Sequence, residues 1–498
     1  MYWIDAGIFI IYMLALLGVG YYFLKKNQTS DDYFVGGRSM SKWHIGLSVV
    51  ATDVGGGFSI GLGGLGFMMG LSGSWMLFTG LIGAWLSAVL LIPKIYKLGR
   101  KINLFTFPQV FGHFYNGKVA LMAGIISGIG YLGFTSSQIL AGAKLASASF
   151  AGLNLHTALI LMGVITVVYT VMGGLKAVIY TDTIQWIVLI SGLCLIGIPL
   201  GYSAIGGWSA IEQTLQPDFL TLHNIQWQQL VNWSVTIVPI WFVGMTLYQR
   251  IYASRSEGDA RKAWFIAGLF EWPVMAFMGV VLGLFARVAA EQGMFSELGF
   301  ATAASMDAEM GLPLLLRSIL PVGLMGLMLS SYFSAILSTA DSCLMAASGN
   351  LLTDILSRFM PLAQDDKRQL RLSQLLTLGL GIVAILLASA MENVLELMLY
   401  SYAFMVSGLL VPLVAAVFFK KSNSAAALMA MAGGGITTVS LTILAVELPF
   451  GLDANIFGLT ASLLLFIAGE NLFPQKRKTK RKIRKPVSNT IVVPTLEN

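Results

Sequence analysis

The stretch Ala51-Thr-Asp-Val-Gly-Gly-Gly57 places an acid and three adjacent glycines in the middle of a long apolar segment, residues 43–70. Neighbouring glycines weaken a helix by about 1 kcal/mol each. In lipid, unwound backbone is tolerated only where it is buried in protein or lines a cavity. The stretch therefore predicts a membrane helix that is broken at half depth beside a cavity. Close packing of helices through small residues is the alternative interpretation.

The composition of the whole chain agrees with a membrane protein. Of its 498 residues, 56% are hydrophobic and 11% are charged, whereas a soluble domain carries roughly 25% charged residues. There are too few charges to cover the surfaces of two or more soluble domains. Composition therefore excludes an ordinary soluble enzyme, a disordered chain and a disulfide scaffold.

Thirteen apolar segments are long enough to cross a bilayer core, which takes about 20 residues per helix. Their approximate bounds are 3–24, 43–70, 73–97, 119–149, 154–173, 177–203, 230–254, 263–288, 321–352, 370–391, 393–419, 424–447 and 450–472. The fold class that they predict is an all-α integral membrane protein.

Lysine and arginine predict the orientation. With the N-terminus outside, 28 of the 31 basic residues fall in cytoplasmic loops or in the tail, which satisfies the positive-inside rule. The C-terminus is then cytoplasmic, and we expect a multi-pass protein of the plasma membrane, in bacteria the inner membrane. The basic run Lys476–Lys485 could bind nucleic acid, but a solvated anchor near anionic lipid is the interpretation that fits a membrane protein.

A second break is predicted around Pro239 and Gly244, near the middle of segment 230–254. The two broken segments are five helices apart. Because five is an odd number, the second set of five helices begins on the opposite side of the membrane and is inverted relative to the first. Matching broken helices in inverted repeats are typical of transporters. The predicted organisation is an extra N-terminal helix at 1–24, a first five-helix repeat at 43–203, an inverted repeat at 230–419, two C-terminal helices at 424–472 and a basic cytoplasmic tail at 473–498.

Ionisable residues at membrane depth are costly and commonly functional. Four acids stand out: Asp53, Asp182, Glu271 and Asp341. Asp341 shares one helical face with Ser334, Ser338 and Ser342. Hydroxyl and carbonyl oxygens suit a hard cation such as Na⁺. Ordinary hydrogen bonding between helices is the alternative role for these hydroxyls.

Several motifs resemble the sodium:solute symporter family. They are the break at 51–56, the segment Gly173–Gln185, the run Ser334–Cys343 and the loop Gly36–Ser39. The resemblance extends over about residues 3–470. It implies a leucine-transporter-like fold in which the first helix of each repeat is broken. It also implies a sodium-coupled symporter, not an enzyme, that imports a small organic solute by alternating access.

The resemblance implies ion sites as well. The family's common sodium site would be formed by Ala51, Val54, Ala335, Ser338 and Thr339. A possible second sodium would be held by Asp182, Asp341 and Ser342. The acid at 341 departs from the family's all-hydroxyl version, so Asp341 binds an ion, titrates or holds a neighbouring helix. Asp53 matches an acid of the sodium–proline branch and is assigned to coupling.

The solute side of the site is predicted at Phe58, Trp241 and Glu271, which fall where family members line their solute pocket. An acid flanked by aromatic rings favours an amine or quaternary ammonium; a salt bridge or hydrogen bond across helices is the alternative. The acid that sugar transporters of the family carry has no counterpart between residues 73 and 97. We therefore expect an amino acid, amine or carboxylate rather than a sugar, with sodium as the co-transported ion and no nucleic-acid partner. A proton-coupled transporter and a membrane sensor on the same scaffold are the alternatives.

Overall fold

The computed structural model describes residues 3–26, 38, 40–150, 152–359 and 366–474. Within its helices, the side chains of residues 23, 24, 26, 53, 54, 57–59, 173–177, 180, 183, 184, 366 and 367 lie outside that description. Three of the predicted site residues, Asp53, Val54 and Phe58, fall in this group.

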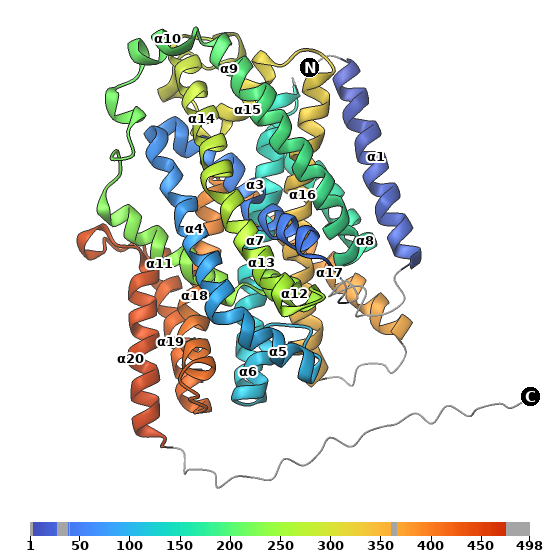
Figure 1. Cartoon of the computed structure of the whole chain (residues 1–498), viewed down its shortest axis with the longest axis vertical. Helices are drawn as coiled ribbons and strands as arrows, with labels where there is room; N and C mark the ends of the chain where they lie inside the picture. The colour runs from blue at the N-terminus through green and yellow to red at the C-terminus, as the bar shows by residue number, and fades with distance from the viewer. Residues whose placement is uncertain (1–2, 27–37, 39, 151, 360–365, 475–498) are drawn as a thin grey trace, which may run out of the picture.

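The described chain is built almost entirely from helices, many of which run roughly along the long axis of the molecule (Figure 1). The helices are α1 Trp3–Lys26, α3 Lys42–Met69, α4 Trp75–Leu86, α5 Ile92–Ile102, α6 Pro108–Phe114, α7 Gly117–Ser149, α8 Leu155–Gly192, α9 Ile198–Ala204, α10 Gly207–Thr214, α11 Trp227–Val243, α12 Met245–Ala253, α13 Glu257–Leu269, α14 Ala276–Glu291, α15 Ala308–Ile319, α16 Leu324–Asn350, α17 Asp366–Ser389, α18 Val394–Val417, α19 Ser424–Ile443 and α20 Ala454–Leu472. Strand pairing in the described residues is limited to one bridge between Met40 and Ser254.

Ten helices in the described part of the chain are long and apolar enough to cross a membrane, or eleven when the bent pair α11 and α12 is counted as one span. The thirteen predicted spans exceed this number at two places. Segments 43–70 and 73–97 are represented by one apolar stretch, Ile60–Ile102. Segment 321–352 forms α16, which is not among the ten because its serines and Asp341 lower its mean hydropathy.

The first predicted break is present in α3. At Gly55 the backbone turns to φ 24° and ψ −158°, a conformation that side chains with a Cβ rarely adopt. A Cβ at Gly55 would lie 2.3 Å from Thr339 Oγ1, so only glycine lets α3 approach α16 here. Next to the break, the amide of Gly56 donates to Gln138 Oε1 on α7 at 2.9 Å. A buried backbone group thus keeps a partner although the helix is interrupted.

The second predicted break separates α11 from α12, which are bent by 41°. Gly244 lies between them with φ −71° and ψ 114°. Pro239 lies within α11 and has no amide hydrogen for the helix. The Tyr248 hydroxyl donates to the carbonyl of Phe242 at 2.8 Å, which satisfies an acceptor near the bend.

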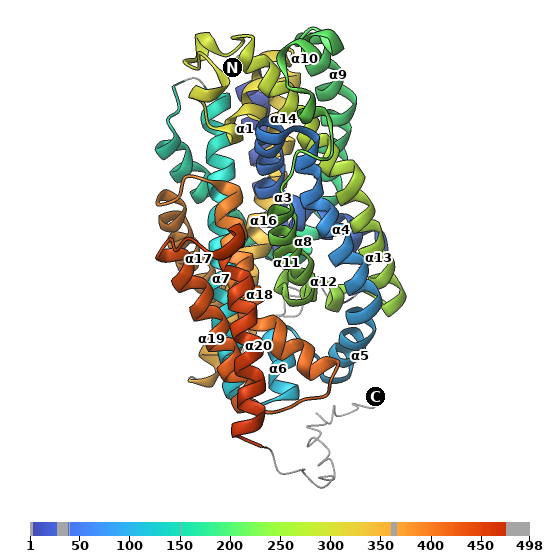
Figure 2. The same cartoon turned by 90° about the vertical axis from the view of Figure 1, so that its left-hand side faces the viewer.

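The two breaks lie in the interior of the bundle, where α16 is buried along nearly all of its length. α16 packs against α1, α3, α7 and α8, while α3 also packs against α13, α14 and α15. The described N-terminal end of α1 lies at the same end of the molecule as α9 and α10, and α5 and α6 lie at the opposite end (Figures 1 and 2).

Candidate functional site

A cluster of buried oxygen atoms joins the break of α3 to the middle of α16. The Thr339 hydroxyl donates to the carbonyl of Ala51 at 2.8 Å and lies 3.3 Å from the carbonyl of Ala335. The Ser338 hydroxyl donates to the same Ala335 carbonyl at 3.1 Å. All four residues are buried. Four of the five residues predicted for the first sodium site therefore converge; for the fifth, Val54, the side chain lies outside the described residues.

The chemistry of this cluster is that of a hard-cation site. It consists of two carbonyl and two hydroxyl oxygens, the atom types that bind hard cations. Within the described residues, no group of three or more His, Cys, Asp or Glu side chains could hold a metal ion. The oxygen cluster thus offers neutral ligands, which suit a monovalent cation.

A second polar cluster lies one turn away and is organised by a buried arginine. Arg250, on α12, is fully buried; its Nε donates to the Ser48 hydroxyl at 3.1 Å and its Nη2 donates to the Ser342 hydroxyl at 3.0 Å. Asp182 Oδ2 accepts from the Ser48 hydroxyl at 2.5 Å and lies 3.7 Å from Arg250 Nη2. A fixed guanidinium therefore accompanies two of the three residues predicted for a second sodium.

Sequence reasoning missed this role of Arg250, which was counted with the cytoplasmic loops. The signal was available: Arg250 lies inside the predicted segment 230–254, where a charge needs a partner. The third residue of the predicted second site, Asp341, has a different partner, because its Oδ1 accepts a short hydrogen bond from the Thr170 hydroxyl on α8. The structure therefore brings Asp182 and Ser342 together around Arg250, and it gives one oxygen of Asp341 a partner at Thr170, on the same helix α8 as Asp182.

The predicted solute residues Trp241 and Glu271 both lie against α4. A Cβ at Gly83 would lie 2.4 Å from Trp241 Cδ1, and a Cβ at Gly80 would lie 2.3 Å from Glu271 Oε2. Both side chains are fully buried, and Trp241 also packs edge-on against Trp264, with ring centroids 6.4 Å apart. Trp241 and Glu271 are thus held about one turn of α4 apart. The side chain of Phe58 lies outside the described residues.

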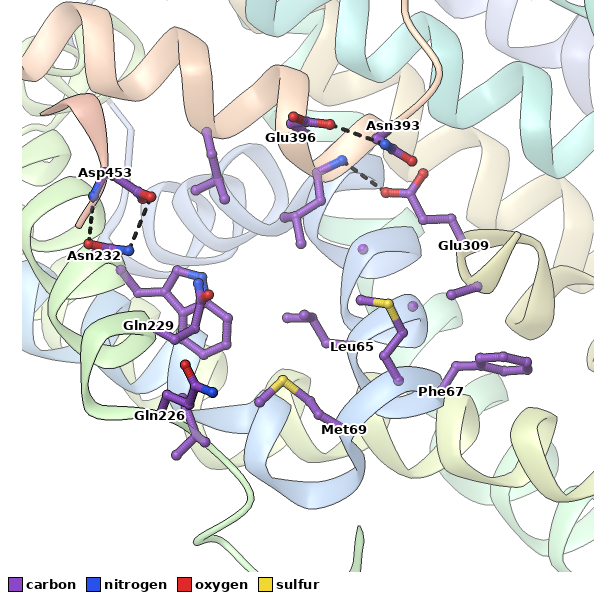
Figure 3. A pocket seen from close by; sticks show the side chains of 18 of the residues that line it. Leu65, Phe67, Met69, Gln226, Gln229, Asn232, Glu309, Asn393, Glu396 and Asp453 are labelled. Atoms are coloured by element: carbon purple, nitrogen blue, oxygen red, sulfur yellow. Dashed lines mark hydrogen bonds between the residues drawn. The ribbon is translucent and has the colours of Figure 1, made fainter. Parts of the chain in front are cut away.

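A large cavity of about 1120 Å³ is lined in part by residues 218–226 and 303–307, in the connections before α11 and before α15 (Figure 3). It reaches inward along α3 as far as Gly61 and along α11 as far as Thr236, and its lining does not include Trp241 or Glu271. Its charged lining residues are Asp218, Arg287, Asp307, Glu309, Glu396 and Asp453. We call this cavity the vestibule.

Carboxamides and acids hold the wall of the vestibule together. The side chain of Asn232 on α11 donates to Asp453 Oδ1 and accepts from the Asp453 amide, both at 3.0 Å (Figure 3). Burial raises the pKa of Asp453, which lies just before α20. Asn455 on α20 donates to the Thr236 hydroxyl on α11 at 3.0 Å. The outer half of the second broken helix is therefore fixed to the C-terminal helices.

A buried ion cluster closes one side of the vestibule, and sequence reasoning gave it no role. Lys144 on α7 lies 2.5 Å from Asp307 Oδ2 and 2.6 Å from Glu309 Oε2, and its side chain is 2% exposed. Glu309 also accepts from the amides of Val394 and Leu395, each at 3.0 Å, at the start of α18. The signal in the sequence was a lone lysine inside the predicted segment 119–149. Its partners lie about 165 residues away, so the pairing could not be read from local spacing.

Comparison with known proteins identifies the family of the chain. The model of the sodium:solute symporter family matches residues 33–434. The chain is 27% identical over 405 residues to the sodium/proline symporter of Escherichia coli (strain K12), covering 79% of each protein. It is 25% identical over 471 residues to the sodium/pantothenate symporter of the same organism, covering 92% of this chain and 95% of that protein. It is also 25% identical over 461 residues to sodium/glucose cotransporter 1 of Ovis aries, covering 83% of this chain and 67% of that protein.

One solved structure supports the fold. A substrate-bound, outward-open structure of a Na⁺-coupled sialic acid symporter superposes with a TM-score of 0.76 at 21% identity. The match covers 95% of this chain and 98% of that one, which supports a leucine-transporter-like fold of about ten to eleven spans. The chain belongs to the sodium:solute symporter family and is a multi-pass, sodium-coupled solute transporter rather than an enzyme.

Proposed function

We propose that the co-transported sodium ion is bound between the break of α3 and α16, by the carbonyls of Ala51, Val54 and Ala335 and the hydroxyls of Ser338 and Thr339. The observation that carries the proposal is the 2.8 Å hydrogen bond from the Thr339 hydroxyl to the Ala51 carbonyl across the break. An ion held there would bind oxygens of both helices at once. Its binding energy would then depend on the relative position of α3 and α16, which is what coupling to a conformational change requires.

The transport cycle that we propose is alternating access. Sodium enters from the vestibule side and stabilises the conformation in which the vestibule is open, and the solute then binds. Rocking of one inverted repeat, residues 43–203, against the other, residues 230–419, exposes both ligands to the opposite side. Coupling is reciprocal, so that sodium tightens solute binding and solute tightens sodium binding. Asp53, next to the break, is proposed to contribute to this coupling.

We propose one sodium per cycle as the basic stoichiometry. A second ion at Asp182, Asp341 and Ser342 would lie beside the guanidinium of Arg250, whose Nη2 is 3.0 Å from Ser342 Oγ and 3.7 Å from Asp182 Oδ2. Like charges repel strongly in a buried site. Arg250 also donates hydrogen bonds to the hydroxyl oxygens of Ser48 and Ser342, so these oxygens are less available to coordinate a second cation.

The solute that we propose carries an ammonium or quaternary ammonium group, as amino acids, amines and betaines do. Five of the six charged residues that line the vestibule are acids. Arg287 and the buried Lys144, which pairs with Asp307 and Glu309, offset two of these five charges and leave an excess of negative charge. A cavity of one dominant sign concentrates ligands of opposite charge. Deeper in the bundle, the carboxyl group of Glu271 lies against Gly80 of α4. About one turn further along α4, the ring of Trp241 lies against Gly83 and contacts the ring of Trp264. Aromatic rings beside an acid favour a cationic group.

We further propose that the N-terminus is extracellular, that the C-terminus is cytoplasmic and that the host membrane is a plasma membrane, in bacteria the inner membrane. Arg250 lies inside the bundle, and the other 27 of the 28 basic residues assigned to the cytoplasmic side still support this orientation. The all-helical architecture supports an inner rather than an outer membrane, because outer-membrane spans are typically β-barrels.

A proton is the alternative coupling ion. The observation that favours it is the buried carboxyl group of Asp341, which is hydrogen-bonded to Thr170 and lies outside the proposed sodium ligands. Replacing sodium by potassium at fixed pH distinguishes the two. If uptake persists in potassium and stops when the proton gradient is dissipated, protons rather than sodium ions drive the transport.

One experiment tests both ion and solute. Purified protein is melted with amino acids, betaines, carboxylates or sugars, in sodium or in potassium at equal ionic strength. A ligand at 100 times its dissociation constant stabilises the folded state by about 2.7 kcal/mol. We expect stabilisation by an ammonium-bearing solute that requires sodium. Stabilisation by a sugar or by an uncharged solute alone would contradict the proposed solute class, and equal stabilisation in potassium would contradict sodium coupling.

A further inference from the structure

A second cavity is lined by residues of α5, α6 and the end of α18. α5 and α6 lie at the opposite end of the molecule from α9 and α10 (Figure 2). The volume of the cavity is about 420 Å³. Four of the ten residues that line it are lysines, namely Lys94, Lys97, Lys101 and Lys420, and the other six are apolar. No acid lines this cavity. We call it the lysine pocket.

Three of these lysines lie on one face of α5. Lys94, Lys97 and Lys101 are spaced by three and four residues on α5, so they share one face of the helix. Ile92 and Ile95 are buried on the other side of α5. α5 is therefore strongly amphipathic, and such helices commonly lie at the boundary between lipid and water.

The inner end of the lysine pocket is fixed by Lys94. Its Nζ lies 3.9 Å from the centroid of the Phe418 ring and donates to the Val417 carbonyl at 3.4 Å. Both contacts involve the C-terminal end of α18, where carbonyl groups carry partial negative charge. Lys94 thus joins α5 to α18 and holds a positive charge at a defined position.

The remaining charges of the lysine pocket are only partly balanced. Lys97 lies 3.5 Å from Glu257, which is 28% exposed. Lys101 and Lys420 form no ion pair within the part of the chain that the structure describes. Burial lowers the pKa of His113 on α6, and the nearby positive charge of Lys101 lowers it further. Like charges at this spacing repel each other, and a bound anion would relieve that repulsion.

The apolar half of the wall indicates what kind of anion fits. Leu98, Phe114 and Phe418 line the lysine pocket beside the lysines. Next to Lys101 and Lys420 in the chain, Ile102 is 40% exposed and Phe419 is 70% exposed. A free inorganic anion would use the lysines and leave these apolar groups in water. A ligand that joins a phosphate to a hydrocarbon chain uses both, and basic pockets between membrane helices commonly bind such headgroups.

We propose that the lysine pocket is a binding site for an anionic phospholipid, with the phosphate held by Lys94, Lys101 and Lys420 and an acyl chain lying along Leu98 and Phe114. The site is separate from the sodium and solute sites, so it does not depend on the proposed function. A lipid bound there would bridge α5, which continues from α4, and the end of α18.

Native mass spectrometry of the full-length, delipidated protein tests this site. The probes are phosphatidylglycerol and phosphatidylcholine with identical acyl chains. We expect phosphatidylglycerol to bind more tightly than phosphatidylcholine. Each lysine near anionic lipid contributes about 1 kcal/mol, so the double variant Lys101→Gln/Lys420→Gln should weaken phosphatidylglycerol binding about 30-fold and leave phosphatidylcholine binding unchanged.

The matched control is Lys118→Gln/Lys262→Gln, which removes two exposed lysines outside the pocket on other helices. An equal loss of phosphatidylglycerol binding in this control would show that the affinity depends only on the overall positive charge of the protein, and it would overturn the proposal. Equal affinity of the wild type for the two lipids would also overturn it, as would release of phosphatidylglycerol by excess inorganic phosphate, which would indicate a site for a free anion. Should the double variant express poorly, each single variant is expected to lose about fivefold, and an unchanged affinity in both would count against the site.

Discussion

Replacing Thr339 by valine removes one proposed sodium ligand and keeps the shape of the side chain. Shape matters here, because Thr339 fills the space that the absent side chain of Gly55 leaves: a Cβ at Gly55 would lie 2.8 Å from both Thr339 Cβ and Cγ2. A smaller residue would open a gap between α3 and α16, whereas valine retains the contact. The substitution therefore tests the hydroxyl oxygen and leaves the packing of the two helices intact.

The expected magnitude follows from the contacts of the hydroxyl. The Thr339 oxygen lies 2.8 Å from the Ala51 carbonyl, so an ion bound to that carbonyl would also be within reach of Thr339. A hydrogen bond or contact with a charged group contributes about 1.5–3 kcal/mol. The sodium concentration at half-maximal effect should accordingly rise about 10- to 150-fold.

Sodium-dependent thermal stabilisation is the assay, because it needs no knowledge of the solute. Melting temperatures of the purified protein are measured over a range of sodium concentrations, with potassium keeping the ionic strength constant. The control is Ser330→Ala on the same helix, whose buried hydroxyl donates only within α16, to the Gly326 carbonyl at 2.6 Å. It should leave the sodium midpoint unchanged. A wild-type midpoint in Thr339→Val would refute the proposed ligand.

Four further outcomes are expected. Lys144→Met should destabilise the protein by about 3–5 kcal/mol, because it leaves the buried carboxylate of Glu309 without its cation; an unchanged melting temperature would show that the cluster contributes little. Gly55→Ala should abolish the sodium-dependent stabilisation, because it adds about 1–3 kcal/mol of backbone strain and places a methyl group against Thr339; a normal sodium response would contradict the need for the break. Glu271→Gln should weaken binding of the solute and leave the sodium midpoint nearly unchanged, and a parallel loss of the sodium response would assign Glu271 to ion binding or structure instead. With one sodium per cycle, uptake in proteoliposomes should show a Hill coefficient for sodium near one and accumulate a neutral solute up to about 500-fold at about 100 mV and a tenfold gradient; a coefficient near two would require a second ion.

The broken helices could be predicted from the sequence because their causes are local. Three glycines beside Asp53, and Pro239 followed by Gly244, disfavour a continuous helix whatever surrounds them. The face of α16 that carries Ser338 follows from the helical period. Residues 51 and 339 could be brought together only through the family resemblance, since nothing in their spacing links two segments that lie 288 residues apart.

What the sequence could not predict are pairings between distant helices. Arg250 and Lys144 each appear in the sequence as one charge in an apolar segment, with nothing to identify their partners. The structure gives Arg250 hydrogen bonds to Ser48 and Ser342, and Lys144 an ion pair with Glu309. The thirteen predicted spans also exceed the ten or eleven found in the described residues. Segments 43–70 and 73–97 share one apolar stretch, and the serines and Asp341 of α16 lower the mean hydropathy of a helix that is 27 residues long.

The central claim is that sodium binds between the break of α3 and α16, and structures of the protein in sodium and in potassium test it most directly. Cryo-electron microscopy in sodium is expected to show a density peak bonded to the carbonyls of Ala51 and Ala335 and to the hydroxyls of Ser338 and Thr339, and the peak should be missing in potassium. A sodium-dependent peak at another place, with the hydrogen bond from Thr339 to Ala51 unchanged in both salts, would contradict the account.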